Sequence, residues 1–303
     1  MKTELDHLPE TNRRELARVV EILFAEFEAA IARGTMPYKR KGAILKVILF
    51  GSYARGDWVD DPIGGYVSDY DLLVVVNDEK LTDITDYWAK AEDHLLREYS
   101  ISHRLTAPVN FIVHSLADVN KQLKVGRYFF TDIARDGIVL YKAPGYHFDQ
   151  PQTLAPAEAL KEAQGYLDYW LPMAAHASQL ADVSVANGVY RDAAFMLHQA
   201  AERAYHGLLL VMTLYSPKSH KLNFLRSQAE QLDVRLAEAW PRGTKFEQRC
   251  FDLLRRAYVD ARYSPHYKIT AEELAWLGER VTVLQGLAKA VCDAWLEVLR
   301  AKA

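Results

Sequence analysis

The 303-residue sequence contains 37 lysine and arginine residues against 40 aspartate and glutamate residues, which gives a formal net charge of −3. Half of its residues are hydrophobic, so the chain is long and apolar enough for two domains with separate cores. It has no basic block, so the composition does not indicate the general affinity for nucleic acids that rests on many lysine and arginine contacts to phosphates.

The cysteines and the apolar runs place the protein in a broad class. Cys250 and Cys292 lie far apart without metal-ligand spacing, which is typical of buried thiols in a reducing compartment. The longest apolar run with helical character, 207–215, is too short to span a membrane, and the first residues lack the apolar core of a secretory signal. We therefore expect a soluble, cytoplasmic protein with no membrane partner.

The first predicted elements are a helix and a strand. Residues 10–33 carry apolar side chains at helical spacing, with Gly34 as a plausible stop, and this helix is expected to cover one face of a sheet. Residues 47–50 form an apolar run typical of a buried strand, which is expected to span 44–50 and stops at Gly51-Ser52.

A loop then leads to a second strand. The connection 57–68 contains proline and glycine, and its acids (Asp57, Asp60 and Asp61) are better explained as solvated loop residues than as ligands. The second apolar run, 72–76, is preceded by Ser68-Asp69-Tyr70-Asp71. Because side chains alternate along a strand, Asp69 and Asp71 are expected to point to the same side.

These two strand ends predict a chemistry. Two neighbouring carboxylates repel each other unless a cation lies between them, and Mg²⁺ binds carboxylate oxygens together with substrate phosphates. A glycine-serine turn lets backbone N–H groups approach a phosphate. A phosphate site at Gly51-Ser52 beside a metal site at Asp69 and Asp71 suits nucleotidyl transfer.

The rest of the first half completes an α/β (α+β) domain with a short mixed sheet. The pattern predicts a helix over 82–99, a third strand over 108–113, a helix capped by Ser115, a short helix ending near Gly137, and a last strand over 138–141.

A composition change divides the chain after this domain. Residues 143–156 contain three prolines and no periodic pattern, which predicts a linker between a domain at 1–142 and a second at 157–303. Beyond it the apolar spacing is helical, which predicts an all-α, up-and-down bundle. The expected helices are 157–186, with a bend at Pro172, then 189–214, 221–240, capped by Ser219, 244–262 and 270–301.

The order Gly51-Ser52, then Asp69-x-Asp71, resembles the DNA polymerase β-type nucleotidyltransferases in their minimal form (MNT), over roughly residues 40–142. The resemblance implies transfer of a nucleoside monophosphate, AMP from ATP as the first candidate, to a hydroxyl with release of pyrophosphate. It also implies that Asp69 and Asp71 hold Mg²⁺ in a two-metal arrangement, and that Gly51 and Ser52, with Arg55 as a lesser candidate, bind the nucleotide phosphates.

The third strand departs from the family pattern. The family usually carries a third carboxylate there, whereas this chain has Asn110, which offers a carbonyl oxygen but can neither carry charge nor act as a base. Transfer on two aspartates, with an acid from elsewhere such as Asp118 or Glu92, and a domain that binds nucleotide but turns over poorly are both compatible with the sequence.

The helical half is similar to HEPN domains. The matching pieces are AAFMLHQAAERAYHGLLLV (193–211), the start of the next helix at His220-Lys221-Leu222, and RRAYVDARYSPHY (255–267). Many HEPN domains are metal-independent ribonucleases that use an arginine and a histidine, for which Arg262 and His266 are the candidates here. Pro265 disfavours helix at Ser264, so the position of His266 relative to Arg262 stays open.

The acceptor and the biological role also stay open. A protein tyrosine (Tyr258, Tyr263 and Tyr267 surround the Arg262–His266 segment), an RNA end and an aminoglycoside-type small molecule are all compatible acceptors. The alternatives to a working transferase are a binding or regulatory module with a degenerate site, and a toxin-like ribonuclease regulated by its N-terminal half, as in a toxin–antitoxin pair. HEPN bundles frequently dimerise, so a homodimer through the helical half is expected.

Overall fold

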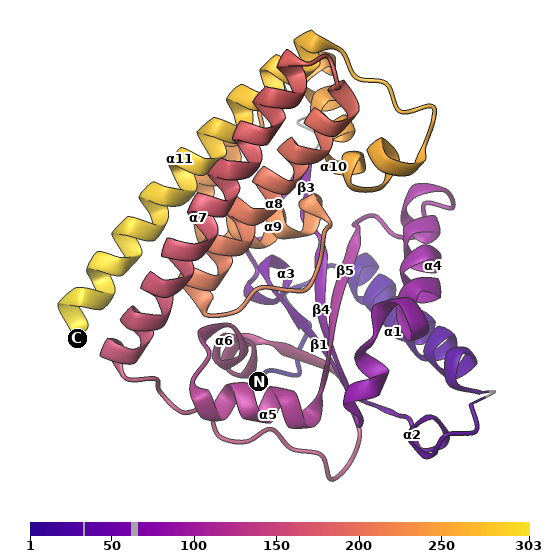
Figure 1. Cartoon of the computed structure of the whole chain (residues 1–303). Helices are drawn as coiled ribbons and strands as arrows, with labels where there is room; N and C mark the ends of the chain where they lie inside the picture. Colours follow the sequence, from indigo (N-terminus) through magenta and orange to yellow (C-terminus); the bar gives the residue numbers. More distant parts are fainter. Residues whose placement is uncertain (33, 62–65) are drawn as a thin grey trace. The chain divides into compact units, whose positions relative to one another are not determined.

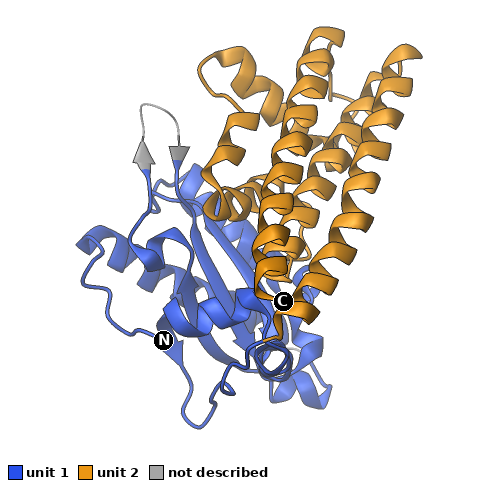
Figure 2. Cartoon of the chain, turned by 90° about the vertical axis from the view of Figure 1, so that its left-hand side faces the viewer, with its two compact units in different colours: residues 1–153 blue, residues 154–303 orange. Residues whose placement is uncertain are grey.

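The structure is a computed structural model that describes residues 1–32, 34–61 and 66–303. The chain folds into two compact units, Met1–Thr153 and Leu154–Ala303, which Figure 2 distinguishes by colour. The first unit contains the predicted sheet and the second is helical. The fold class expected from the sequence is thus confirmed.

A four-stranded mixed sheet forms the centre of the first unit. Its strands are β1 (Ile44–Phe50), β4 (Tyr70–Val76), β5 (Val109–Ser115) and β6 (Ile138–Lys142), in the order β5-β4-β1-β6. β1 runs antiparallel to β4 and β6, and β4 runs parallel to β5. Every residue of β1 and β4 is buried, which explains why both strands are apolar except for Lys46 and Asp71.

Helices cover both faces of this sheet (Figure 1). On one face lie α1 (Glu10–Ile31) and α4 (Ala89–Ser100), and the apolar stripe of α1 packs into a core with Tyr70, Leu72 and Val74 of β4. On the other face lie α5 (Leu116–Val125) and α6 (Tyr128–Asp136). Ser115 caps α5 as predicted, since its Oγ accepts a hydrogen bond from the backbone N–H of Asp118 at 3.1 Å.

The segment predicted as one helix over 82–99 is divided. A 3₁₀ turn at Glu79–Thr82 is followed by a π-helical turn at Ile84–Trp88 and then by α4. The side chain of Asp83 accepts a hydrogen bond from the backbone N–H of Asp86 at 2.8 Å, so a new helical turn begins there. The first unit also contains the short elements α2 (Pro37–Arg40), α3 (Ser52–Arg55), β2 (Asp60–Asp61) and β3 (Tyr66–Val67).

Long helices build the second unit, and α7, α8 and α11 run side by side in Figure 1. The helices are α7 (Pro156–Ala186), α8 (Tyr190–Thr213), α9 (Leu222–Leu232), α10 (Lys245–Tyr263) and α11 (Ala271–Lys302). Capping boxes start the last two: Thr244 with Glu247 and Thr270 with Glu273 exchange side-chain and backbone hydrogen bonds. Pro172 lies inside α7.

Two expectations about the third helix of the bundle were wrong. The predicted helix 221–240 ends at Leu232, because Asp233 adopts an extended conformation and its side chain caps a separate 3₁₀ helix at Val234–Ala239. Ser219 is not the capping residue of α9. Lys221 occupies that position, and the Ser219 hydroxyl instead accepts from the backbone N–H of Lys221 at 3.2 Å.

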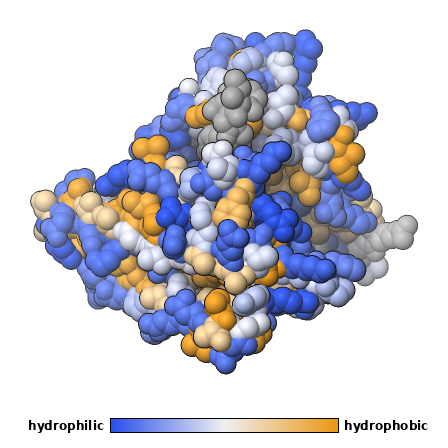
Figure 3. Space-filling view, turned by 90° about the horizontal axis from the view of Figure 1, so that it is seen from above, coloured by the Kyte–Doolittle hydropathy of each residue, from blue (hydrophilic) through white to orange (hydrophobic). Residues whose placement is uncertain are grey.

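Hydropathy along the helices sets a limit on membrane insertion. Among the described residues, none of the helices combines the length and the apolar content that crossing a bilayer requires. On the face seen in Figure 3, hydrophobic residues form small separate spots between hydrophilic ones.

Packing between α7 and α8 depends on a glycine. A Cβ added at Gly207 would lie 2.7 Å from the Cβ of Trp170, so Gly207→Ala is expected to lower the free energy of unfolding by about 1–3 kcal/mol despite alanine's better helix propensity. Gly286→Ala in α11 is the control, since nothing lies within 4 Å of its added Cβ, and we expect stabilisation of up to about 1 kcal/mol. Urea unfolding measures both, and equal effects of the two substitutions would contradict the packing argument.

Candidate active site

The candidate active site lies where β1 ends beside the start of β4. Phe50 pairs with Asp71 across the two antiparallel strands, so Gly51 and Ser52 follow directly beside the aspartates. Gly51 has a φ of 75°, a left-handed conformation that glycine adopts without strain, and it turns the chain into α3. The Ser52 Oγ is buried and has no hydrogen-bond partner among the described residues, so it retains the capacity to bind a ligand oxygen.

The two aspartates share one face of β4, as predicted. The aromatic ring of Tyr70, between them, points into the core under α1, so Asp69 and Asp71 point towards the opposite face. Asp71 is fully buried and Asp69 is half-buried. A buried carboxylate loses its hydration, so its charged form has to be stabilised by hydrogen-bond donors or by a bound cation.

Asn110 belongs to this group. β5 pairs with β4 so that Asn110 lies beside Asp71, and its Nδ2 donates a hydrogen bond to Asp69 Oδ2 at 2.9 Å. The amide therefore replaces a repelling third carboxylate with a donor that fixes the orientation of Asp69. The structure thus brings Gly51, Ser52 and the three strand residues together, and their roles stay predictions.

The acids suggested as substitutes for a third carboxylate lie elsewhere. Asp118 follows the far end of β5, roughly 17 Å along the strand from Asn110, and accepts hydrogen bonds from His114 and Gln122. His114 lowers the pKa of Asp118 through this hydrogen bond. Glu92 lies on α4, which covers the opposite face of the sheet. The side chains of Asp60 and Asp61 lie outside the described residues.

Arg55, the remaining nucleotide-binding candidate, ends α3. Its side chain is 40% exposed, and its Nε donates to Asp57 Oδ2 at 3.1 Å. It therefore stands at the rim of the site with a surface ion pair that a more negative partner would replace at little cost.

The donor set fits a hard divalent cation. Two carboxylates on one strand face, next to an amide and a buried hydroxyl, supply the oxygen ligands that Mg²⁺ prefers when it also binds phosphates. Within the described residues there is no group of three histidine, cysteine or acidic side chains arranged for a metal ion, so phosphate and water oxygens would complete the coordination.

In the second unit, Arg262 and His266 make hydrogen bonds to different residues. α10 ends at Tyr263, and His266 lies exposed in the turn that follows, with its backbone N–H bonded to Ser264 Oγ. The Arg262 guanidinium instead donates from Nε to the Tyr258 carbonyl at 2.6 Å and packs over the Tyr258 ring, 4.3 Å from its centroid. The structure shows no hydrogen bond between Arg262 and His266 among the described residues.

A buried carboxylate in this unit has three histidines around it, and sequence reasoning missed two of them, His206 and His220, as members of the cluster. Glu202 Oε1 accepts from His220 Nδ1 at 2.9 Å, and its oxygens lie 3.5 Å from His198 Nδ1 and 3.9 Å from His206 Nε2. The i, i+4 spacing of His198, Glu202 and His206 on α8 was the available signal, whereas His220 arrives from the following loop. His220 stacks on Tyr258, with centroids 4.2 Å apart.

Burial sets the protonation of this cluster. Loss of hydration lowers the pKa of His198 to about 3 and that of His206 to about 4, and it raises the pKa of Glu202. The two buried imidazoles are thus neutral at physiological pH.

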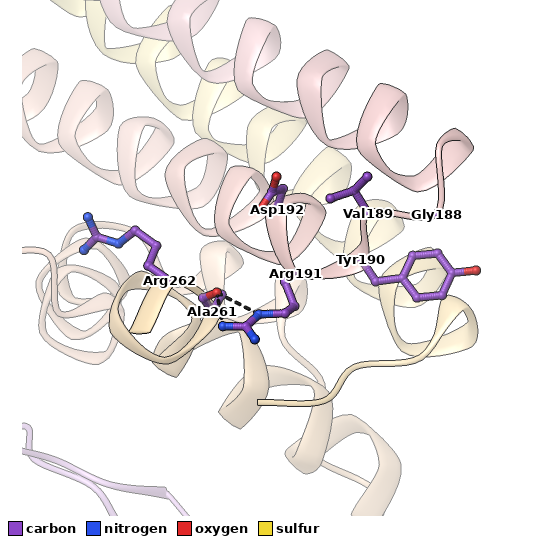
Figure 4. A pocket seen from close by; sticks show the side chains of 7 residues that line it. All are labelled: Gly188, Val189, Tyr190, Arg191, Asp192, Ala261 and Arg262. Carbon is purple, nitrogen blue, oxygen red and sulfur yellow. Dashed lines mark hydrogen bonds between the residues drawn. The ribbon is translucent and has the colours of Figure 1, made fainter. Parts of the chain in front are cut away.

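A pocket of about 630 Å³ opens where α8 begins near the end of α10 (Figure 4). Its lining residues are Gly188, Val189, Tyr190, Arg191, Asp192, Ala261 and Arg262. Arg191 donates two hydrogen bonds to the Ala261 carbonyl, at 2.9 and 2.7 Å, while the Arg262 guanidinium points away from it. Arg191 thus connects the start of α8 to the end of α10.

Comparisons with known proteins agree with this geometry. Residues 37–143 match the family described as "Polymerase beta, Nucleotidyltransferase", and residues 167–283 match the HEPN domain. A Methanocaldococcus jannaschii protein named "Putative protein adenylyltransferase MJ0604" is 36% identical over 103 residues, which are 34% of this chain and 84% of that protein.

The chain therefore belongs to the polymerase β-type nucleotidyltransferases. Its helical region contains a HEPN domain, which follows the nucleotidyltransferase domain in the sequence. Both family resemblances inferred from the sequence are confirmed.

The role of Asn110 as a donor predicts a metal-dependent stability. Asn110→Asp places a third carboxylate beside Asp69 and Asp71, so we expect a melting temperature several degrees lower in EDTA, restored by millimolar Mg²⁺. Asn77→Asp, at a loop where Asn77 bonds Ala43 and Lys41, is the matched control and is expected to show no Mg²⁺ effect. Thermal unfolding that is equally insensitive to Mg²⁺ in both variants would contradict the assignment.

The histidine cluster predicts a pH dependence. Between about pH 6.5 and 4 the unfolded chain protonates His198 and His206 while the folded protein does not, so stability falls as the pH falls; the raised pKa of Glu202 offsets part of this loss. His198→Asn should reduce the change between pH 7 and 5 by about 1–2 kcal/mol. Amide hydrogen exchange of α8 peptides measures this, and an unchanged pH dependence would contradict it.

Proposed function

We propose that this chain transfers a nucleoside monophosphate, AMP from ATP as the first candidate, to a hydroxyl acceptor and releases pyrophosphate. The observation that carries the proposal is the register of β1, β4 and β5, which groups the glycine-serine turn, two aspartates and Asn110. The family membership of residues 37–143 and the similarity to a protein named as an adenylyltransferase support it.

Each residue has a part in the proposed reaction. The backbone at Gly51 and the orphan hydroxyl of Ser52 would bind terminal phosphate oxygens, and Arg55 would contact the triphosphate from the rim. Asp69 and Asp71 would hold Mg²⁺, which would neutralise the charge on the phosphates and on the attacking oxygen. Asn110 keeps the Asp69 carboxylate in one orientation through its hydrogen bond.

Among the tyrosines near the Arg262–His266 segment, exposure favours one as an acceptor. The Tyr267 ring is buried and its hydroxyl donates to the Leu253 carbonyl at 3.0 Å, while the Tyr258 ring packs against both His220 and Arg262. Tyr263 is 73% exposed. A tyrosine acceptor in the HEPN domain would thus be Tyr263.

The remaining acceptors and roles have less support. A small-molecule acceptor of the aminoglycoside type and an RNA end remain open as substrates, and a toxin–antitoxin role and a homodimer remain predictions. A ribonuclease that uses Arg262 with His266 also remains a prediction, since the hydrogen bonds of these two residues go to Tyr258 and Ser264.

The metal assignment is tested by removing one charge. Asp71→Asn should lower nucleotidyl transfer a hundredfold or more while the protein stays folded, because the neutral amide binds Mg²⁺ weakly. Asp93→Asn, an exposed acid on α4, is the control and should retain activity. Transfer is followed as labelled AMP on protein or as pyrophosphate released with added acceptors. Normal turnover by Asp71→Asn would remove the assignment.

The acceptor is tested by intact mass after incubation with ATP and Mg²⁺. We expect the wild type to gain one adenylyl group and Tyr263→Phe to gain none. Tyr267→Phe, at the buried tyrosine, should behave as the wild type. Modification that persists in Tyr263→Phe would exclude this tyrosine as the acceptor.

A further inference from the structure

A buried carboxylate on α1 lies beneath the start of both strands that carry the site. Glu15 is 5% exposed and faces the sheet from the side opposite to Asp69 and Asp71. Its Oε2 accepts a hydrogen bond from the Tyr70 hydroxyl at 2.9 Å. Tyr70 is the residue between the two aspartates, so this bond holds the backbone from which both carboxylates project.

The same carboxylate also binds the chain before β5. The backbone N–H of Thr106 donates to Glu15 Oε1 at 3.2 Å, and the Thr106 hydroxyl donates to Oε2 at 3.1 Å. Two residues later, the carbonyl of Pro108 accepts from the backbone N–H of Tyr70 at 2.8 Å. Glu15 therefore links the start of β4 to the start of β5, just before Asn110.

Tyr70 also contacts the glycine-serine turn, where the nucleotide phosphates are proposed to bind. Its ring lies 4.4 Å from the Tyr53 ring, and Tyr53 follows Ser52 at the glycine-serine turn. Its hydroxyl also accepts from Asn12 Nδ2 at 2.6 Å, so two residues of α1 hold it.

We propose that Glu15 is a positioning residue for the metal site: through Tyr70 and Thr106 it fixes the spacing of Asp69, Asp71 and Asn110. The inference rests on the proposed function, because it concerns the same carboxylates. A buried carboxylate that only stabilises the fold would be expected to connect its own helix to one neighbouring element. Glu15 contacts Tyr70, which lies between the two aspartates, and Thr106, which lies four residues before Asn110, so its loss lets the aspartates move relative to Asn110.

Metal affinity tests this without requiring turnover. Mn²⁺ binding to the full chain is measured by electron paramagnetic resonance for the wild type, Glu15→Ala, Tyr70→Phe and the double variant. We expect each single variant to bind Mn²⁺ about tenfold more weakly or worse, as is typical when the support of a metal ligand is removed. Because both variants remove the hydrogen bond between Tyr70 and Glu15, their effects on Mn²⁺ affinity should be less than additive in the double variant.

Two further variants separate positioning from general stability. Glu15→Gln keeps an oxygen acceptor for Tyr70 and should recover most of the affinity. Glu26→Ala, on the same helix, removes a carboxylate that pairs with His94 and should bind Mn²⁺ as the wild type does. Tyr70→Phe keeps the ring that packs on Tyr53, so it reports on the hydrogen bond even where Glu15→Ala fails to fold.

The outcomes are distinct. Wild-type affinity in both Glu15→Ala and Tyr70→Phe, or additive losses in the double variant, would overturn the positioning role and leave the proposed function standing. Absence of Mn²⁺ binding by the wild type would overturn the metal assignment itself, and the positioning role with it.

Discussion

Repulsion between two carboxylates on a buried strand is the constraint that the first unit has to satisfy. Asp69 and Asp71 project from one face of β4, and Asp71 is fully buried. Without bound metal, hydrogen-bond donors and backbone restraint have to offset the lost hydration. Asn110 supplies a donor on the face of the aspartates, and Tyr70 is held from the other face by Glu15. The strand pair β4–β5 is thus restrained on both sides.

The second unit also buries a carboxylate, but imidazoles surround it there. Glu202 lies among His198, which is fully buried, His206, which is 12% exposed, and His220, which is 55% exposed. An amide donor such as Asn110 does not titrate, whereas an imidazole gains a positive charge as the pH falls. The buried histidines therefore make the stability of the helical unit sensitive to acid, whereas the donor at the candidate active site is an amide that carries no charge.

Local sequence signals predicted most elements, because continuous apolar runs, helical spacing and capping residues act over a few positions. The strands 44–50 and 138–141, the Ser115 cap and the helices around 189–214 and 270–301 are examples. Breaks set by a single aspartate, at Asp83 and Asp233, were missed because either residue is also acceptable inside a helix.

The candidate site was predictable to the extent that it depends on chain order and strand alternation. The grouping of Gly51-Ser52 with Asp69 and Asp71 follows from both. The bond from Asn110 to Asp69 and the contacts of Glu15 and His220 join residues far apart in sequence, and only the packed structure shows them. The relation of Arg262 to His266 could not be derived because Ser264 leaves the helix between them.

Asn110 also affects how many divalent cations the proposed site would need to balance its charge. Two carboxylates carry the charge of one divalent cation, whereas three would exceed it and draw a second ion before any nucleotide arrived. A site balanced by one ion would take its further cation together with the incoming triphosphate. In the proposed reaction, occupancy of the site would then follow the supply of metal-bound nucleotide more than that of free metal.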